Sequence, residues 1–325
     1  MGSKKVLFIG IGFYDYEDSI VKEFNKLDYQ VDYFSEVPSN NWTYRFHSRM
    51  RNSNKLNEIN NYHAKQIANK SDADYDLIFI IKCENMSYDA LKIIKAKNPK
   101  AKFILYLWDS VIRIANIKSK FDFFDEIYSF DRIDCLANKR FSFNPLFFRE
   151  EYVQNVDKKN AYDLYHLGWY HSDRLNLVKK IAKFCNENGQ KYKLQLLTGY
   201  FSYYIHKLTN KELGTSKEFL IFKTLSTKQN VDNILVSNII LDIAHPLQSG
   251  LTMRTIELLG SQKKLITTNA DVVNYDFYKP TNIFIIDREN PQLDLNFFKQ
   301  PYQYIPDEIR QKYSINNWLK RMINN

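Results

Sequence analysis

The chain has 325 residues, 44% of them hydrophobic and 15% aromatic, which is enough for two hydrophobic cores and excludes intrinsic disorder. Its three cysteines, Cys83, Cys135 and Cys185, have neither paired nor metal-ligand spacing, and no apolar run has the length of a signal-peptide core or a membrane span, so we expect a cytoplasmic protein without structural zinc. The formal net charge of +9 is spread along the chain rather than clustered with aromatic residues, which argues against nucleic acid as a partner.

The first part of the chain alternates between strand and helix patterns. We predict strands over 5–10, 30–34, 76–82, 102–108 and 126–130. Helical patterns separate them at 18–27, 57–69 and 87–98, and a polar insertion rich in Asn, Ser and Arg occupies 35–60. This alternation is typical of a parallel sheet.

A second set of the same patterns begins near residue 150. Strands are predicted over 163–167, 193–197, 239–243, 264–267 and 283–287, with helices at 174–188, 230–237 and after Gly250. Two prolines then precede a terminal helix over 307–322. The sequence thus predicts an α/β protein with two Rossmann-like domains, residues 1–150 and 151–300, and a terminal segment of residues 301–325.

Polar residues follow the predicted strands of the first domain, where open parallel sheets bind ligands. Asp109 and Asp131 come directly after strands and are candidates for the general base that deprotonates an acceptor hydroxyl, although either is equally explained as a helix N-cap. Gly10 and Gly12 end the first strand, but the third glycine of a dinucleotide fingerprint is missing and Asp15 stands in its place. We expect these three residues to lie beside an acceptor rather than a phosphate.

The segment from His245 to Asn269 has the features of an anion-binding loop. The backbone N–H groups after Gly250 have no helical partners and lie at the positive end of a helix dipole. The positive charge of Arg254 interacts unfavourably with the positive end of that dipole. A phosphate or diphosphate bound between Arg254 and the helix end would make the interaction favourable. Glu257 shares the helical face of Arg254 and is placed to accept hydrogen bonds from two ribose hydroxyls; the alternative is an exposed Arg254–Glu257 pair on an ordinary amphipathic helix.

This segment resembles the nucleotide-sugar-binding segment of GT-B glycosyltransferases, especially bacterial enzymes of capsule and lipopolysaccharide assembly. The likeness lies in a Gly-Leu pair, an arginine, a glutamate and a Lys-Leu-Ile-Thr strand, and it spans residues 248–257 and 264–269. It implies that Glu257 holds the donor ribose and that Gly250, Leu251 and Thr252 offer backbone N–H groups to the diphosphate. The matched segment also includes Gln248 and Ser249.

The resemblance has further implications for the whole chain. It implies that the two domains face across a cleft, as in the GT-B fold, and that the helix within 301–325, with Trp318, packs back towards the first domain. The resembled enzymes also carry Trp-Asp-Ser and Phe-Asp at the strand ends that hold Asp109 and Asp131 here. Retaining members often have an earlier glutamate where this chain has Ser249, so inversion is favoured.

Several residues of the second domain are weaker candidates. His166 and His171 flank Gly168 at its first turn, with a spacing that suits a metal poorly, and we expect them to line the site without chemistry. Arg174 follows as a candidate phosphate contact. His245 ends a strand, where it would either contact the donor or be a buried, hydrogen-bonded histidine.

These observations predict a glycosyltransferase that moves a sugar from a nucleotide-sugar donor to a surface-polysaccharide or lipid-linked glycan acceptor. Neither a metal nor another cofactor is expected, because helix N–H groups and Arg254 would stabilise the leaving diphosphate. A diffuse lysine excess suits phosphorylated substrates or peripheral contact with the inner face of the plasma membrane, and codon usage alone also explains part of it. The alternatives are a Rossmann-fold epimerase or dehydrogenase, and a non-catalytic nucleotide-sugar or glycan-binding protein.

Overall fold

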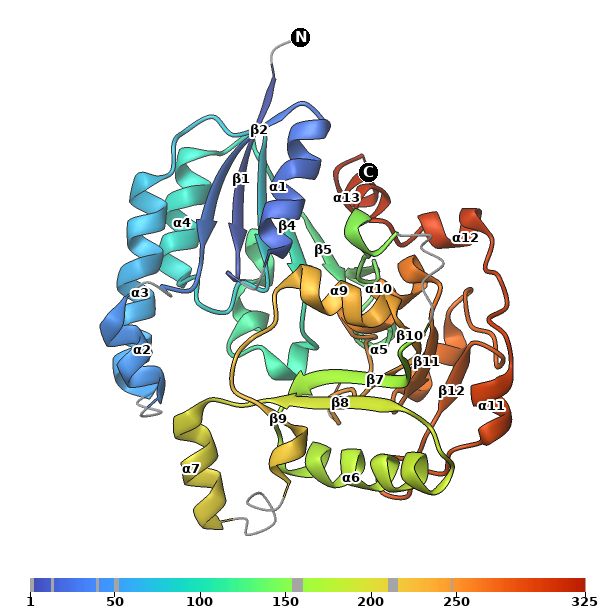
Figure 1. Ribbon diagram of the computed structural model, residues 1–325. Coiled ribbons are helices and arrows are strands. Elements are labelled where there is room, and N and C mark those ends of the chain that lie inside the picture. Colours follow the sequence, from blue (N-terminus) through green and yellow to red (C-terminus); the bar gives the residue numbers. More distant parts are fainter. Residues whose placement is uncertain are drawn as a thin grey trace. The chain divides into compact units, whose positions relative to one another are not determined.

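The computed structural model describes residues 3–12, 15–38, 41–49, 53–153, 160–209, 216–246 and 248–324. The chain divides into two units (Figure 1). Unit 1 comprises residues 1–146, 247–250 and 315–325, and unit 2 comprises residues 147–246 and 251–314. Each unit holds a six-stranded parallel sheet, which confirms the predicted α/β class with two Rossmann-like domains.

The sheet of unit 1 has the strand order β2-β1-β3-β4-β5-β6. Its strands are β1 (Lys4–Gly10), β2 (Tyr29–Ser35), β3 (Leu77–Ile81), β4 (Lys102–Leu107), β5 (Glu126–Ser129) and β6 (Phe141–Phe143). The connecting helices are α1 (Tyr16–Lys26), α2 (Trp42–Arg49), α3 (Ser53–Lys70), α4 (Tyr88–Lys97), α5 (Arg132–Ala137) and the 3₁₀ helices η1 (Val111–Arg113) and η2 (Ile117–Phe123).

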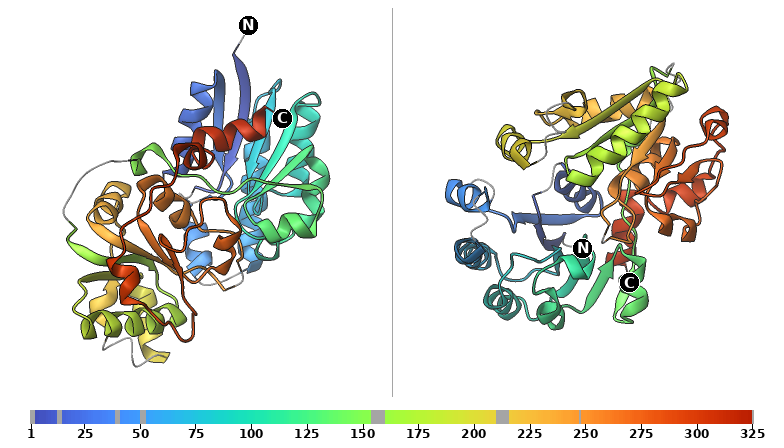
Figure 2. Two further views of the ribbon diagram at one scale, coloured as in Figure 1. Left: turned by 90° about the vertical axis from the view of Figure 1, so that its right-hand side faces the viewer. Right: turned by 90° about the horizontal axis from the view of Figure 1, so that it is seen from below.

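Alternate side chains of these strands build two cores, one on each face of the sheet. Leu7 and Ile9 of β1 belong to the core that α3 and α4 cover, while Phe8 turns to the other face and contacts Phe24 of α1. Trp318 of α13 (Ile315–Ile323), which is 0% exposed, packs edge-on against Phe79 and Tyr106. Figure 1 and the turned views of Figure 2 show α13 beside α1. The segment 315–324 therefore completes the second core of unit 1.

The sheet of unit 2 has the order β12-β11-β10-β7-β8-β9. Its strands are β7 (Tyr162–Trp169), β8 (Tyr192–Leu197), β9 (Leu220–Ile221), β10 (Ser237–Asp242), β11 (Lys264–Thr267) and β12 (Ile283–Ile285). The helices are α6 (Ser172–Glu187), α7 (Tyr200–Thr209), α9 (Thr227–Leu235), α10 (Met253–Ser261), α11 (Leu295–Lys299) and α12 (Asp307–Gln311), with short 3₁₀ turns η3 (Glu150–Tyr152), η4 (Lys217–Phe219) and η5 (Ala270–Asn274).

One prediction of local structure was wrong, and one helix was not predicted. The polar insertion at 35–60 contains the unpredicted α2 and the start of α3. The predicted helix over 307–322 is split into α12 and α13, because the Tyr313 carbonyl accepts a hydrogen bond from the Phe148 N–H at 2.8 Å and Ser314 forms a parallel bridge with Phe148. The pairing draws the chain out of the helix at this point. No helix among the described residues combines the length and apolar character that a membrane crossing needs.

The turn after β3 is strained and is held by the buried side chain of Glu36. Lys82 and Cys83 both adopt positive φ angles, 67° and 59°, which non-glycine residues rarely do. Glu36, 1% exposed, accepts hydrogen bonds from the backbone N–H groups of Glu84 and Asn85, both at 3.3 Å. Lys120 donates to the carbonyls of Cys83 and Glu84, at 2.7 Å and 2.9 Å. These hydrogen bonds hold the turn in its strained conformation.

Burial raises the pKa of Glu36 to about 8 from an ordinary value of 4.5, against the opposing effects of the Asn85 N–H, Lys120 and Lys82. The folded chain then retains a proton that the unfolded chain releases, so this group makes the protein less stable as the pH rises through that window. We expect Glu36→Gln to lose less unfolding free energy than the parent between about pH 5 and about pH 8 in urea titrations. Glu58→Gln, at an exposed glutamate, is the control and should follow the parent. An equal change of unfolding free energy with pH in all three proteins would contradict the raised pKa of Glu36.

Candidate functional site

The loop after β1 contains its own carboxylate. Glu17 of α1 is buried and accepts a hydrogen bond from the Ile11 N–H at 3.1 Å. A Cβ on Gly10 would lie 2.7 Å from Glu17 Cγ, and Gly12 has a φ of 66°, so both positions require glycine. Asp15 is exposed next to them. The negative charge of Glu17 and Asp15 makes this loop unsuitable for a phosphate.

Asp109 lies just beyond the carboxyl end of β4 between two cations. Lys82 Nζ is 3.1 Å from Asp109 Oδ2, and Arg113 Nη1 is 2.8 Å from Asp109 Oδ1. Lys82 also pairs with Glu84 at 2.8 Å, which ties it to the strained turn. The N-cap of η1 is Ser110, so Asp109 caps no helix. Its side chain is 22% exposed, which leaves it within reach of a ligand.

Asp131, in contrast, is the N-cap of α5 and is 1% exposed. Its carboxylate accepts hydrogen bonds from the Ile133 N–H at 3.0 Å and from the hydroxyls of Ser110 and Ser249. Burial by itself raises the pKa of Asp131, but these hydroxyls and the Gly250 N–H outweigh it and hold the pKa below its ordinary value. This geometry favours the capping interpretation over that of a general base.

The loop residues Gln248, Ser249 and Gly250 belong to unit 1, although the chain on either side of them belongs to unit 2. Arg113 donates to Gln248 Oε1 at 2.7 Å. A Cβ on Gly250 would lie 2.4 Å from the Phe130 ring, so only glycine fits there. The structure therefore groups these three predicted donor-binding residues with Asp109 and Asp131. The Gly250 N–H, which we expected at the diphosphate, is bound by Asp131.

In unit 2, a buried aspartate organises the start of α10. Asp242 is the last residue of β10 and accepts hydrogen bonds from the hydroxyls of Thr252 at 2.8 Å and Thr255 at 3.2 Å. Thr252 is also the N-cap of α10, because its hydroxyl accepts from the Thr255 N–H at 3.3 Å. Arg254 lies 3.7 Å from Asp242 Oδ1. Asp242 thus supplies the negative charge that Arg254 would otherwise lack in the first turn.

Three arginines gather at the carboxyl ends of β7 and β10. Arg254 donates to the Leu167 carbonyl, and Arg174 donates to the carbonyls of Trp169 at 3.1 Å and Ile243 at 2.9 Å. Arg288 donates to the Ala244 carbonyl and pairs with Asp173. Two carboxylates, Asp242 and Asp173, thus face three guanidinium groups. The surplus positive charge beside a helix N-terminus is what an anion-binding site requires.

His166 lies beneath this cluster. Its Nδ1 donates to the Leu241 carbonyl at 2.8 Å, which assigns the proton to Nδ1, and Nε2 is buried without a hydrogen-bond partner among the described residues. Burial and the positive charges of Arg254 and Arg174 lower the pKa of His166 to about 3. A Cβ on Gly168 would meet Nε2 at 2.8 Å, so Gly168 makes room for the ring. His166 is a neutral spacer among cations.

Glu257 is buried rather than exposed on α10. It hydrogen-bonds with the Tyr152 hydroxyl, which Arg149 also contacts. Burial, first, and then the negative charge of Glu257 raise the pKa of Tyr152. The proposed alternative of an exposed Arg254–Glu257 pair is thereby wrong, since Arg254 turns to Asp242 and Glu257 to Tyr152.

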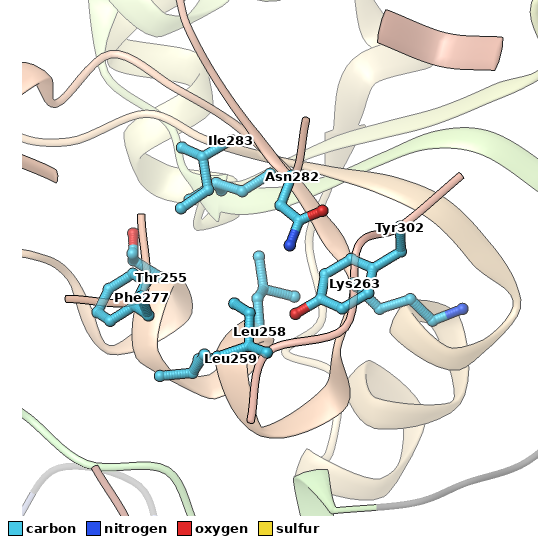
Figure 3. Close-up of a pocket in the computed structure, with 10 residues that line it drawn as sticks. Thr255, Leu258, Leu259, Lys263, Phe277, Asn282, Ile283 and Tyr302 are labelled. Atoms are coloured by element: carbon cyan, nitrogen blue, oxygen red, sulfur yellow. The ribbon is translucent and has the colours of Figure 1, made fainter. Parts of the chain in front are cut away.

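The remaining candidates differ in exposure. His245 is half-buried directly after the Ala244 carbonyl that Arg288 binds, whereas His171 is exposed at the start of α6. A small cavity of unit 2, with space for about one water molecule, lies against α10 and is lined mostly by apolar groups, with Lys263, Asn282 and Tyr302 at its polar side (Figure 3). It contains none of the predicted site residues and is too small for a nucleotide. The described residues contain no group of three or more His, Cys, Asp or Glu side chains placed to hold a metal ion.

Sequence reasoning missed five charged residues around Asp109 and in the arginine cluster: Lys82, Arg113, Asp173, Asp242 and Arg288. Asp242 ends a buried strand, so the rule that selected Asp109 and Asp131 would also have found it. Arg288 follows β12 in the same way, after the exposed Asp287. Lys82 and Arg113 had no comparable signal, because their roles depend on a strained turn and on a 3₁₀ helix.

Comparison with known proteins supports the fold and little more. No protein-family model and no curated protein sequence matches the chain. Among solved structures, a glycosyltransferase from Rickettsia africae is similar at 11% identity and a TM-score of 0.59, over 100% of this chain and 98% of that one. Anabaena HepE in complex with UDP and glucose is similar at 9% identity and a TM-score of 0.65, over 99% of each chain.

A protein with a different reaction is similar as well. The UDP-GlcNAc 2-epimerase from Methanocaldococcus jannaschii matches at 8% identity and a TM-score of 0.56, over 99% of this chain and 100% of that one. Because identities this low speak to architecture alone, these likenesses establish a GT-B-type fold of two Rossmann-like domains.

Proposed function

We propose that the protein is a glycosyltransferase that uses a nucleotide-sugar donor. The observation that carries the proposal is the arginine cluster of unit 2, Arg174, Arg254 and Arg288, gathered around the N-terminus of α10. Solved structures of the same fold include glycosyltransferases, and one of them, HepE, is described in complex with UDP and glucose. The resemblance of residues 248–257 to the donor-binding segment of such enzymes points the same way.

The charge balance of the cluster suits a diphosphate. The guanidinium groups now bind backbone carbonyls of strand ends, and each guanidinium has five N–H donors, so donors remain for a ligand. A diphosphate would replace weak carbonyl acceptors with charged ones and would meet the dipole of α10. Since His166 is neutral and acts only as a spacer, the site keeps its positive charge without burying a fourth cation.

The same groups would stabilise the leaving nucleoside diphosphate when the glycosidic bond to the donor breaks. Fixed cations and helix N–H groups perform the charge stabilisation that other transferases assign to a metal ion, so we propose a metal-independent reaction. Glu257 is proposed to hold the ribose, with Tyr152 and Arg149 fixing its carboxylate.

Asp109 is proposed as the general base that takes the proton of the acceptor hydroxyl. It lies at a strand end of unit 1, is partly exposed, and is oriented by Lys82 and Arg113. Direct attack of an activated hydroxyl on the anomeric carbon inverts its configuration, so we propose an inverting transfer to a surface-polysaccharide or lipid-linked acceptor.

A nucleotide-sugar epimerase is the second candidate, favoured by the likeness to the UDP-GlcNAc 2-epimerase. The two activities separate in one assay. A transferase releases free nucleoside diphosphate in proportion to the glycosylated acceptor, whereas an epimerase interconverts the donor without an acceptor. Incubation with a panel of nucleotide sugars, with and without acceptor glycans, distinguishes them.

Arg254→Ala should weaken binding of UDP by about ten- to a hundredfold, which corresponds to the loss of one charge-assisted hydrogen bond of about 1.5–3 kcal/mol. Isothermal titration calorimetry measures the change. Arg140→Ala is the matched control, because Arg140 also pairs with one aspartate but lies in unit 1. Equal UDP affinity in the parent and in Arg254→Ala would remove the cluster from the donor site.

Glu257→Gln should weaken UDP binding because the amide accepts fewer ribose hydrogen bonds than the carboxylate does. The loss should be smaller for 2′-deoxy-UDP, which lacks one of the two hydroxyls. Calorimetric titration of both ligands with the parent and the variant gives the comparison. An identical loss for the two nucleotides would show that Glu257 does not contact the 2′-hydroxyl.

Asp109→Asn should lower kcat by about a hundredfold or more while UDP affinity stays at the parental value. Asp131→Asn should instead lower the unfolding free energy by about 1 kcal/mol or more, because α5 loses a charged cap and Ser249 its partner. Steady-state kinetics and urea titration of both variants test the contrast. Parental turnover in Asp109→Asn would refute its role as the base.

A further inference from the structure

Helix α7 carries large aromatic side chains on its outer surface. Tyr200, Phe201 and Tyr204 are 66%, 67% and 64% exposed, which is unusual for three aromatic residues within one and a half helical turns. Tyr200 and Tyr204 are four residues apart and share one face, and Lys207 continues that face three residues further. We call these four residues the α7 face.

The α7 face is held in place by packing beneath it. Tyr203 is buried and meets Phe222 edge-on with ring centroids 5.4 Å apart, while Tyr200 stacks flat on the same ring at 4.5 Å. Phe222 directly follows β9, the edge strand of the sheet, and Figure 1 draws α7 at this end of unit 2. The outward direction of Phe201 and Tyr204 is thus set by the fold of unit 2 itself.

Exposed lysines accompany these aromatic residues along the chain. Among the described residues of 200–228, Lys207, Lys217, Lys223 and Lys228 are exposed, against one exposed glutamate, Glu218. Lys207 is exposed on α7, and Lys223 is exposed directly after Phe222, the ring on which Tyr200 stacks. Aromatic rings with lysines beside them are the composition of helices that lie at the interface of an anionic bilayer, where the rings enter the headgroup layer and the lysines meet lipid phosphates.

We propose that the α7 face, with Lys223, is a peripheral docking site for an anionic phospholipid surface. Phe201 and Tyr204 would insert among the headgroups, and Lys207 and Lys223 would provide charge complementarity to the lipid phosphates. A sheet edge that carries such a face holds unit 2 near lipid-linked molecules. The proposal is independent of the transferase assignment, because none of these residues belongs to the arginine cluster.

The test is co-sedimentation of the full chain with vesicles of phosphatidylcholine and phosphatidylglycerol in equal parts, and with vesicles of phosphatidylcholine alone. The parent should bind the anionic vesicles more strongly. Phe201→Ser with Tyr204→Ser should lower that binding about tenfold or more, because the inserted apolar surface is lost. Lys207→Gln with Lys223→Gln should lower it by a similar factor on anionic vesicles only, since each lysine contributes about fivefold there.

Tyr62→Ser with Tyr304→Ser, which removes two aromatic residues of similar exposure elsewhere, is the matched control and should bind like the parent. The unfolding free energy from urea titrations should stay close to the parental value in all three double variants, which shows that they fold. Tryptophan fluorescence of Phe201→Trp should be quenched by brominated lipids in the anionic vesicles. The proposal would be overturned if the α7-face variants bound vesicles as the control variant does, or if the parent did not bind. It would also be overturned if the α7-face variants had a raised KM for a water-soluble acceptor but unchanged vesicle binding.

Discussion

Charge compensation at the carboxyl ends of parallel strands is the constraint on which both candidate sites depend. Parallel strands bring their polar successors to one edge of the sheet, and burial there leaves no water to solvate an isolated charge. In unit 1, the negative charge of Asp109 is compensated by two ion pairs, with Lys82 at one carboxylate oxygen and Arg113 at the other. Unit 2 meets this constraint incompletely, because three arginines share two aspartates. An anionic ligand would complete the compensation there.

The hydrogen-bond partners of the carboxylates, rather than their charge alone, distinguish those that stabilise the fold from the one proposed as the general base. Asp131 and Asp242 are both nearly inaccessible and accept hydroxyl donors from serine or threonine, so each fixes a loop next to a helix start. Asp109 pairs with the cations Lys82 and Arg113, without a hydroxyl donor among the described residues, and stays partly exposed. The same residue type at equivalent positions therefore differs in role through the burial and partners that its loop provides.

Most strands and their order along the chain were predictable, because continuous apolar runs such as 77–81 and 239–241 are explicit in the sequence. Helix α2 and the break between α12 and α13 were not, since the first lies in a polar stretch and the second depends on pairing with Phe148, far away in sequence. The start of α10 and the glycine at 250 were predictable from local patterns. The direction of Glu257 was not, because it depends on Tyr152, a residue outside the motif.

The route of the chain through unit 1 has a consequence for its biosynthesis. Trp318 covers Phe79 and Tyr106, so this face of the first sheet lacks part of its cover until residues 315–323 have left the ribosome. Unit 2, which ends at residue 314, has all its strands available before that moment. The cover of the N-terminal sheet is thus completed last, so part of its apolar face stays exposed during translation, when aggregation competes with folding.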